Sequence, residues 1–283
     1  MVAGPNGSGK TTLIQTLRAS PEISLPAIYI NADDLGRQRG LDARAAQQLA
    51  ASLRSDAIAR RQSFLYETVM SHPSKIAELQ AAAGAGYAIT VVFVATDDPN
   101  INIERVALRV ADDGHDVPRE RIRTRHRRSL AIAPSAISFA AHAYIYDNTD
   151  WGTEGVRQLQ AVLIGSRLQP TLGQPARWVG ELIQRANARA AELEDLHQSV
   201  KDRMPLAVPN LTRSVSDGVI AIAGQHFALQ IEQASSVALV HDKGLLPKAV
   251  TRRQNYRIEY NDGVANVVRR SAVRIRAVTS TRK

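Results

Sequence analysis

A glycine-rich segment near the amino terminus has the residue types that bind nucleotide phosphates. Gly4-Pro5-Asn6-Gly7-Ser8-Gly9-Lys10-Thr11 matches the pattern G-x-x-x-x-G-K-[ST] in full. Small residues let the backbone curl around an anion, so that successive N–H groups face the β-phosphate. Lys10 is expected to reach the β- and γ-phosphate oxygens, and the Thr11 hydroxyl to ligate Mg²⁺. The segment, extended by Thr12, therefore predicts a site for ATP or GTP with magnesium.

Polar side chains follow three of the expected strands at the point where each strand ends. The clusters are Asn31-Ala32-Asp33-Asp34, Glu67-Thr68 and Asp147-Asn148. Ligands of open α/β sheets bind outside the carboxyl ends of the strands. A kinase that acts on a hydroxyl needs a carboxylate to accept the proton. Asp33 or Asp34 is therefore the candidate base. The alternative is that these aspartates cap the helix that follows. Glu67 is expected to orient the acceptor or to hold the water shell of the metal ion.

Arginines that can neutralise a transferring phosphoryl group come next along the chain. Arg105 and Arg109 are four residues apart, so they lie on one face of a helix expected near 102–110. A loop at 112–118, with His115 as a hinge contact, precedes a cluster of six arginines between Arg119 and Arg128. This arrangement predicts a mobile lid that brings arginines onto the γ-phosphate and excludes water.

Bringing these residues together requires a parallel sheet flanked by helices. In residues 1–167, β-rich runs alternate with helical patterns, which is typical of a P-loop kinase-like α/β domain. The expected strands are 2–3, 27–30, 64–66, 89–95 and 143–146, and the expected helices are 10–19, 42–61, 73–85, 102–110, 118–131 and 155–166.

The remaining residues indicate a linking region and a second domain. Residues 168–174 are rich in Gly, Pro and polar residues, and a helix over about 175–203 follows, which gives a linker and helix over 168–206. Residues 207–283 predict a small basic all-β domain with about six short strands, one of them at 272–278.

The composition narrows the class of protein. Of the 283 residues, 44% are hydrophobic and none is cysteine, which excludes disulfides and thiolate metal sites. The apolar runs are too short to cross a membrane and no secretory signal is seen, so we expect a cytoplasmic protein without a membrane partner. The net charge is +9, and residues 251–283 alone carry nine basic and two acidic residues. This basic tail predicts either contact with nucleic acid or a solvated surface.

Several of these segments, in this order over about residues 1–150, resemble the zeta-toxin family. They are 4–12, Ile30-Asn31-Ala32-Asp33, Tyr66-Glu67-Thr68, 105–109, Gly114-His115-Asp116-Val117-Pro118, 125–130 and Tyr146-Asp147-Asn148. The resemblance implies an ATP- or GTP-dependent kinase that phosphorylates a sugar hydroxyl of UDP-N-acetylglucosamine. It also implies a small antitoxin protein as partner, which blocks the nucleotide site.

The same resemblance implies roles for single residues. Lys10 resembles the phosphate-binding lysine and Asp33 the general base. Arg105 resembles one of two phosphate arginines. Because Gly114-His115-Asp116 stands where the founding toxins have the second arginine, either Arg109 or Arg125 supplies that charge or it is missing. The expected acceptor contacts are Asn31, Asp34, Glu67 and Thr68.

A weaker resemblance covers residues 214–268, which are similar to the small β domain of plasmid proteins of the KfrB type. It rests on Gly218-Val219-Ile220, Phe227-Ala228-Leu229-Gln230, Leu239-Val240-His241 and 258–263. The prediction is thus a toxin-like kinase of a UDP-amino sugar. Two alternatives stay open: a P-loop kinase of another nucleotide, a cofactor or a small antibiotic, and a nucleotide-binding module held on nucleic acid by its basic tail.

Overall fold

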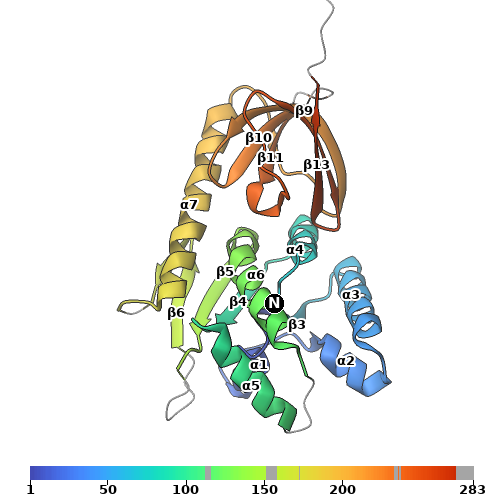
Figure 1. Cartoon of the computed structure of the whole chain (residues 1–283), viewed down its shortest axis with the longest axis vertical. Coiled ribbons are helices and arrows are strands. Elements are labelled where there is room, and N and C mark those ends of the chain that lie inside the picture. Colours follow the sequence, from blue (N-terminus) through green and yellow to red (C-terminus); the bar gives the residue numbers. More distant parts are fainter. Residues whose placement is uncertain (112–115, 151–157, 172, 233–234, 236, 272–283) are drawn as a thin grey trace, which may run out of the picture. The chain divides into compact units, whose positions relative to one another are not determined.

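A computed structural model describes residues 1–111, 116–150, 158–171, 173–232, 235 and 237–271 (Figure 1). The expected hinge residue His115 and the expected strand 272–278 lie outside these residues. The chain divides into two compact units, Met1–Ala191 and Glu192–Lys283. None of the helices in the described ranges is long and apolar enough to cross a membrane.

The first unit contains a seven-stranded sheet in the order β2-β3-β1-β4-β5-β6-β7. The strands β1 to β5 pair in parallel, whereas β6 and β7 add to the β5 edge in antiparallel fashion. The strands are β1 Val2–Ala3, β2 Ile28–Ile30, β3 Phe64–Thr68, β4 Thr90–Ala95, β5 His142–Asp147, β6 Gln158–Ile164 and β7 Arg167–Pro170. This topology confirms the predicted P-loop kinase-like class.

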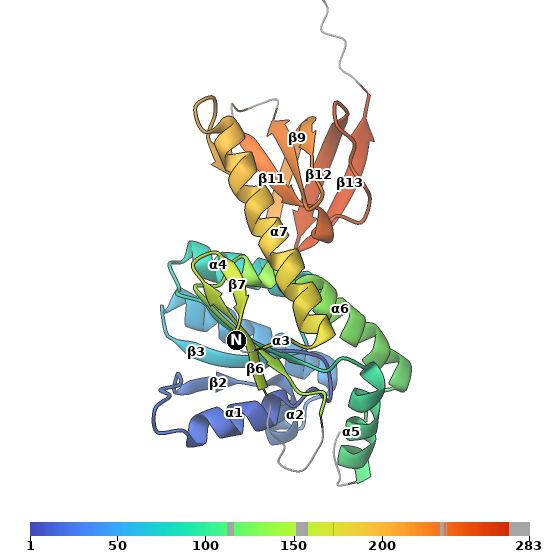
Figure 2. The same ribbon diagram turned by 90° about the vertical axis from the view of Figure 1, so that its left-hand side faces the viewer.

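Helices cover both faces of this sheet. They are α1 Lys10–Ala19, α2 Ala32–Arg39, α3 Ala43–Ala59, α4 Ser74–Gly84, α5 Pro99–Ala111, α6 Arg119–Ile137 and α7 Arg177–Val200, whose last turns belong to the second unit. The chain moves one way along the sheet from β1 to β2 and the other way from β3 to β4, so right-handed crossovers put α1 and α4 on opposite faces (Figure 2).

The shortest strand is the central one. Val2 and Ala3 of β1 are fully buried, and each has one partner in β3 and another in β4. Because Ala3 is in register with Thr68, the glycine-rich segment begins beside the carboxyl end of β3. This register brings the phosphate-binding segment next to Glu67.

Two sequence predictions for the first unit are wrong. The helix expected at 155–166 is instead β6 over its described part, and β7 occupies the start of the expected linker at 168–174. Residues 158–164 contain Val162, Leu163 and Ile164, whose apolar side chains suit a strand as well as a helix. The open edge of β5 decides between them, because it supplies backbone hydrogen-bond partners that a local pattern does not reveal. Helix α2 was also not foreseen as a separate element.

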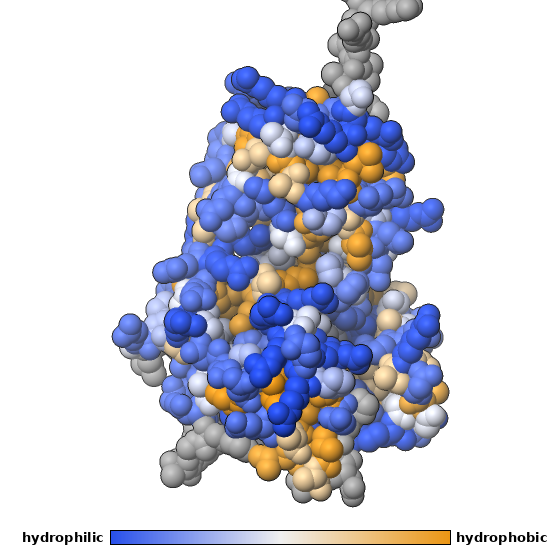
Figure 3. All heavy atoms as spheres, viewed as in Figure 1, coloured by the Kyte–Doolittle hydropathy of each residue, from blue (hydrophilic) through white to orange (hydrophobic). Residues whose placement is uncertain are grey.

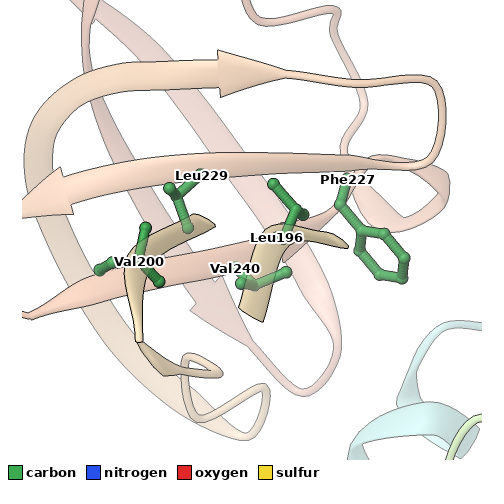
Figure 4. Packing of buried hydrophobic residues seen from close by; sticks show 6 residues of the cluster. Leu196, Val200, Phe227, Leu229 and Val240 are labelled. Atoms are coloured by element: carbon green, nitrogen blue, oxygen red, sulfur yellow. The ribbon is translucent and has the colours of Figure 1, made fainter. Parts of the chain in front are cut away.

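The second unit is built on a six-stranded sheet in the order β13-β12-β9-β10-β11-β8, antiparallel except for β8 against β11. Leu196 and Val200 of α7 pack against Phe227, Leu229 and Val240 of the sheet (Figure 4). The elements are β8 Leu206–Ala207, β9 Arg213–Ala223, β10 Phe227–Glu232, β11 Ala238–Asp242, the 3-10 turn Lys243–Leu245, β12 Asn255–Asn261 and β13 Val264–Arg270. The predicted mostly β second region is confirmed.

A buried histidine network lies on the other side of this sheet. The His241 ring is inaccessible to solvent, with Nδ1 3.1 Å from the Tyr260 hydroxyl and Nε2 3.0 Å from Oε1 of Gln230. The amide of Gln230 in turn donates to the carbonyls of Gly218 and Tyr256. Burial lowers the pKa of His241 to about 4, so the folded chain holds this ring neutral.

We therefore expect acid to destabilise the second unit. The unfolded chain, in which the pKa of His241 returns to its ordinary value, binds the proton at a higher pH. The free energy of unfolding should consequently fall between pH 6.5 and pH 4, by about 3 kcal/mol at most. Denaturant unfolding of the full chain across this range measures the slope. His241→Gln should flatten it, whereas the exposed His197→Gln should leave it unchanged; equal slopes in the wild type and His241→Gln would contradict the assignment.

Candidate active site

The glycine-rich segment is held so tightly that two of its positions accept glycine only. The Gly4 amide donates to the Thr68 carbonyl at 3.2 Å, and a Cβ at Gly4 would lie 1.9 Å from the carbonyl oxygen of Val94. Gly7 has φ +75°, and a Cβ there would lie 2.5 Å from the carbonyl oxygen of Asn102. Gly4 and Gly7 thus allow the loop to pack closely against β3, β4 and α5.

Lys10 and Thr11 begin α1 and meet the same carboxylate. The Lys10 ammonium donates to the Pro5 carbonyl at 2.9 Å and lies 3.9 Å from Oε1 of Glu67. The Thr11 hydroxyl lies 3.1 and 3.0 Å from the two oxygens of Glu67. Burial lowers the pKa of Lys10, an effect that Glu67 and Asp33 oppose and that Arg109 and Arg125 reinforce. All of these charges therefore act on one ammonium group.

Glu67 is itself held by two side chains from the β2 end. The Tyr29 hydroxyl and the Asn31 amide each donate to Oε2 of Glu67 at 3.2 Å, and the same amide lies 3.0 Å from the Tyr29 oxygen. Burial raises the pKa of Tyr29 to about 12, so its phenol stays a hydrogen-bond donor even well above neutral pH. Glu67 is thereby fixed beside the phosphate-binding segment.

The two candidate base residues occupy different environments. Asn31 caps α2, because its Oδ1 accepts from the amides of Asp33 and Asp34 at 2.8 and 3.4 Å. Neither aspartate is therefore needed as the cap. Asp34 forms an ion pair with Arg37, whereas Asp33 is exposed and lines the cavity described below.

Two of the predicted arginines are linked to the phosphate-binding segment, Arg125 directly and Arg105 through Asn148. Arg105 donates to the Asn148 carbonyl at 2.8 Å, and the Asn148 amide donates to the Ser8 carbonyl at 2.9 Å. Arg125 donates to Oδ1 of Asn6 at 3.2 Å, and burial together with Arg121 lowers its pKa, whereas Asp33 opposes this. Loop and arginines thus form one hydrogen-bonded assembly.

A cavity of about 750 Å³ collects most of these side chains. The predicted residues that line it are Asn6, Gly7, Gly9, Lys10, Thr11, Thr12, Asn31, Asp33, Glu67, Thr68, Arg105, Arg109 and Arg125. Gly4, Pro5, Ser8 and Asp34 do not line it. The polar lining residues that sequence reasoning did not single out are Arg44, Gln47, Arg54, Ser71, His72 and Lys75, whereas Arg121 belongs to the arginine cluster predicted between Arg119 and Arg128. Figure 3 has the same view as Figure 1 and shows hydrophilic residues over the position of α6.

The oxygen ligands near Thr11 suit magnesium. Mg²⁺ prefers hard oxygen donors and is usually bound by one or two carboxylates, substrate phosphates and water. The Thr11 hydroxyl and the Glu67 carboxylate provide such donors within 3.1 Å of each other. In the described ranges no group of three or more His, Asp or Glu side chains is placed to hold a metal without a phosphate ligand.

Replacing Arg125 should test whether this arginine serves catalysis. We expect Arg125→Gln to lower kcat of phosphoryl transfer about 10- to 10²-fold, because one positive charge beside the reacting phosphate is lost. Steady-state kinetics with saturating ATP measures the effect. Arg127→Gln removes an exposed arginine from the same helix outside the cavity and is the matched control. An equal loss in both variants would refute a role specific to Arg125.

Comparison with known proteins assigns the family. The family model described as Zeta toxin matches residues 1–151, which is more than half of the chain. The chain belongs to the zeta toxin family. The resemblance of about residues 1–150 to this family, predicted from the sequence, is confirmed. No curated protein matches it.

Several solved structures are remotely similar to this zeta toxin family member. The native AvrRxo1-ORF1:-ORF2 complex has 12% identity and a TM-score of 0.48, over 65% of this chain and 62% of that chain. This chain thus spans less than two thirds of that relative. The same complex with ATP has 13% identity and a TM-score of 0.46, over 69% and 74%. A structure from the PezAT toxin-antitoxin system of Streptococcus pneumoniae has 16% identity and a TM-score of 0.37, over 69% and 86%.

Proposed function

We propose that this chain transfers the γ-phosphate of ATP or GTP to a hydroxyl of a UDP-amino sugar such as UDP-N-acetylglucosamine. The observation that carries the proposal is a cavity whose lining includes Lys10, the carboxylates of Asp33 and Glu67, and the guanidinium groups of Arg105, Arg109 and Arg125. These are the groups that phosphoryl transfer to a hydroxyl requires. Membership of the zeta toxin family supports the choice of a sugar nucleotide as acceptor.

In this proposal the phosphate-binding segment holds the donor. Lys10 and the backbone amides of residues 4–11 bind the β- and γ-phosphates, and the dipole of α1 adds positive potential at its amino terminus. When the terminal phosphoryl group leaves, the bond from the γ-phosphorus to the bridging oxygen breaks and its electrons remain on the nucleoside diphosphate. Lys10 stabilises the negative charge that develops there.

The acceptor hydroxyl is activated from the β2 side. Asp33 accepts its proton while the hydroxyl oxygen forms the new bond to the γ-phosphorus. Asp33 does not cap α2, because Asn31 does. Its carboxylate acts electrostatically on both Lys10 and Arg125. A carboxylate so close to the donor-binding groups suits a base that works at the reacting phosphate.

Two further groups complete the proposed reaction. Thr11 and, directly or through water, Glu67 would hold Mg²⁺, which would neutralise phosphate charge. Arg105, Arg109 and Arg125 stabilise the transferring phosphoryl group and limit the access of water, which otherwise turns a kinase into an ATPase. Because Arg105 and Arg125 are hydrogen-bonded to the phosphate-binding segment or to its neighbour Asn148, little rearrangement is needed to bring them to the donor.

We further propose a cytoplasmic protein whose activity is restrained by a small antitoxin protein. The support is family membership, together with the similarity to a structure from PezAT, which is a toxin-antitoxin system. Contact of the basic carboxyl-terminal region with nucleic acid, and its likeness to KfrB-type domains, stay predictions.

A labelling assay tests the proposed reaction. The protein is incubated with Mg²⁺, γ-labelled ATP or GTP and a panel of UDP-sugars, and the products are identified by mass. We expect UDP-N-acetylglucosamine to gain one phosphoryl group in the wild type and not in Lys10→Ala. Label that is released only as inorganic phosphate, or that enters only acceptors other than UDP-sugars, would overturn the proposal.

A further inference from the structure

Three buried polar side chains beside the phosphate-binding segment have no part in the proposed reaction. Thr96 directly follows β4, Asn102 lies in the first turn of α5, and His126 lies in α6 next to Arg125. Thr96 and Asn102 are inaccessible to solvent, and His126 is 3% exposed. Burying a polar group is costly unless it is hydrogen-bonded, so the partners of these side chains show what they hold in place.

Asn102 meets the phosphate-binding segment at two points. Its side-chain amide donates to the Asn6 carbonyl at 2.6 Å. Its own carbonyl oxygen is the atom that leaves no room for a Cβ at Gly7. The N–H groups of such a segment face the anion, so the carbonyl groups of the same planar peptides face away from it and need donors from the protein. Asn102 supplies one of these donors.

Asn102 is itself oriented by Thr96 and linked through it to His126. Since the Asn6 carbonyl can only accept, the Asn102 nitrogen faces it, and Oδ1 of Asn102 accepts from the Thr96 hydroxyl. The same hydroxyl lies 3.2 Å from the Asp98 carbonyl. The Thr96 carbonyl accepts from Nε2 of His126 at 2.9 Å. Burial lowers the pKa of His126, so at pH 7 its ring is neutral and its one N–H faces Thr96.

These hydrogen bonds close a ring that passes through Asn6. The Asn6 side chain accepts from Arg125 at 3.2 Å, and Arg125 directly precedes His126 in α6. The phosphate-binding segment and Arg125 are therefore connected twice, once directly and once through the three buried residues. A buried network whose hydrogen bonds are satisfied favours one arrangement and limits the motion of the groups attached to it.

We infer that Thr96, Asn102 and His126 are positioning residues, which hold Arg125 in place against the phosphate-binding segment during phosphoryl transfer. The inference rests on the proposed function, since it concerns the rate of that reaction. A displaced guanidinium loses contact with the charge that develops in the transition state, whereas the backbone amides still bind the nucleotide. The network should therefore affect the chemical step more than the affinity for ATP.

Two substitutions of Thr96 separate positioning from packing. Thr96→Val removes the hydroxyl and keeps nearly the same shape, whereas Thr96→Ser keeps the hydroxyl. In a single turnover of bound γ-labelled ATP, the label is followed whether it goes to an acceptor or to water. Thr96→Val should slow this step about 5- to 10-fold and change the Kd of ATP less than about 3-fold, and Thr96→Ser should restore most of the rate.

Thr124→Val is the matched control, because it removes a hydroxyl from α6 next to Arg125 but outside the network and the cavity. It should keep the wild-type rate. A normal rate in Thr96→Val, or an equal loss in Thr96→Val and Thr96→Ser, would overturn the inference.

A double variant shows whether the network acts through Arg125. Arg125→Gln already removes the group that is positioned, so adding Thr96→Val to it should cost less than about 2-fold more in rate. Losses that multiply would place the effect of Thr96 elsewhere and overturn the inference. His126→Gln and His126→Met repeat the test at a second position, because a glutamine amide can donate to the Thr96 carbonyl and a methionine thioether cannot. The methionine variant should be the slower of the two.

Hydrogen exchange separates this inference from the proposed reaction, because it needs no turnover. In the full chain without nucleotide, Thr96→Val should speed amide exchange at least about 5-fold in peptides that cover residues 4–9 and 119–128, and not in peptides from 213–232 of the second unit. Unchanged exchange, or faster exchange in all of these peptides, overturns the inference even if UDP-N-acetylglucosamine is phosphorylated. Faster exchange confined to 4–9 and 119–128, in a wild type that transfers no phosphoryl group, supports the network and overturns only the proposed reaction.

Discussion

Lys10→Ala is expected to lower kcat/KM for phosphoryl transfer by at least about 10²-fold. The Lys10 ammonium is buried beside the phosphate-binding segment and within 3.9 Å of Glu67, so a bound triphosphate gains a charge contact there that water cannot replace. Alanine removes this contact from both the ground state and the transition state. Steady-state kinetics with ATP, together with equilibrium binding of ATP, measures both losses.

The matched control must remove a lysine without touching the site. Lys201→Ala removes an exposed lysine from the second unit and should keep wild-type turnover. A Lys10→Ala variant that folds normally and still turns over at more than a tenth of the wild-type rate would contradict the assigned role. If the protein is toxic to its host, the same substitution should relieve growth arrest.

Asp33→Asn is expected to lower kcat by at least about 10²-fold while ATP binding is kept. The amide is almost the same size as the carboxylate but cannot accept the acceptor proton, so the donor site should be intact and the chemical step slow. Single-turnover measurements with bound ATP separate the two. This split between binding and chemistry distinguishes Asp33 from Lys10.

Asp34→Asn is the control for the neighbouring carboxylate. Asp34 forms an ion pair with Arg37 and does not line the cavity, so its replacement should change kcat by less than about 3-fold. A large loss in Asp34→Asn with normal turnover in Asp33→Asn would move the base to Asp34. Normal turnover in both variants would show that the general base does not lie at this strand end.

The parallel sheet and the site at its carboxyl edge were predictable because each depends on a local pattern. The phosphate-binding pattern is contiguous, and the position of Glu67 after an apolar run was enough to place it at a strand end. The structure brings Glu67 to Thr11 through the register of β1 with β3. Asn31 was expected only as an acceptor contact; its roles as helix cap and as partner of Glu67 depend on the geometry after β2.

The residues that sequence reasoning missed are those whose setting depends on contacts between distant elements. Arg54 reads as an ordinary arginine of an amphipathic helix, and only the packing of α3 beside α4 buries it against Glu78. Arg44 and Lys75 likewise carry no local signal for a cavity. The strand β6 was missed for the same reason, since its conformation is decided by the open edge of β5.

Magnesium-dependent binding of nucleotide is the measurement that tests the account most directly. ATP and GTP are titrated calorimetrically into the full chain with Mg²⁺ and with a chelator in its place. We predict saturable binding of at least one of them, weakened at least about 10-fold by the chelator and by Lys10→Ala. Absence of binding by the wild type, or binding of equal strength in all three conditions, would contradict the assignment of residues 4–11 as the donor site.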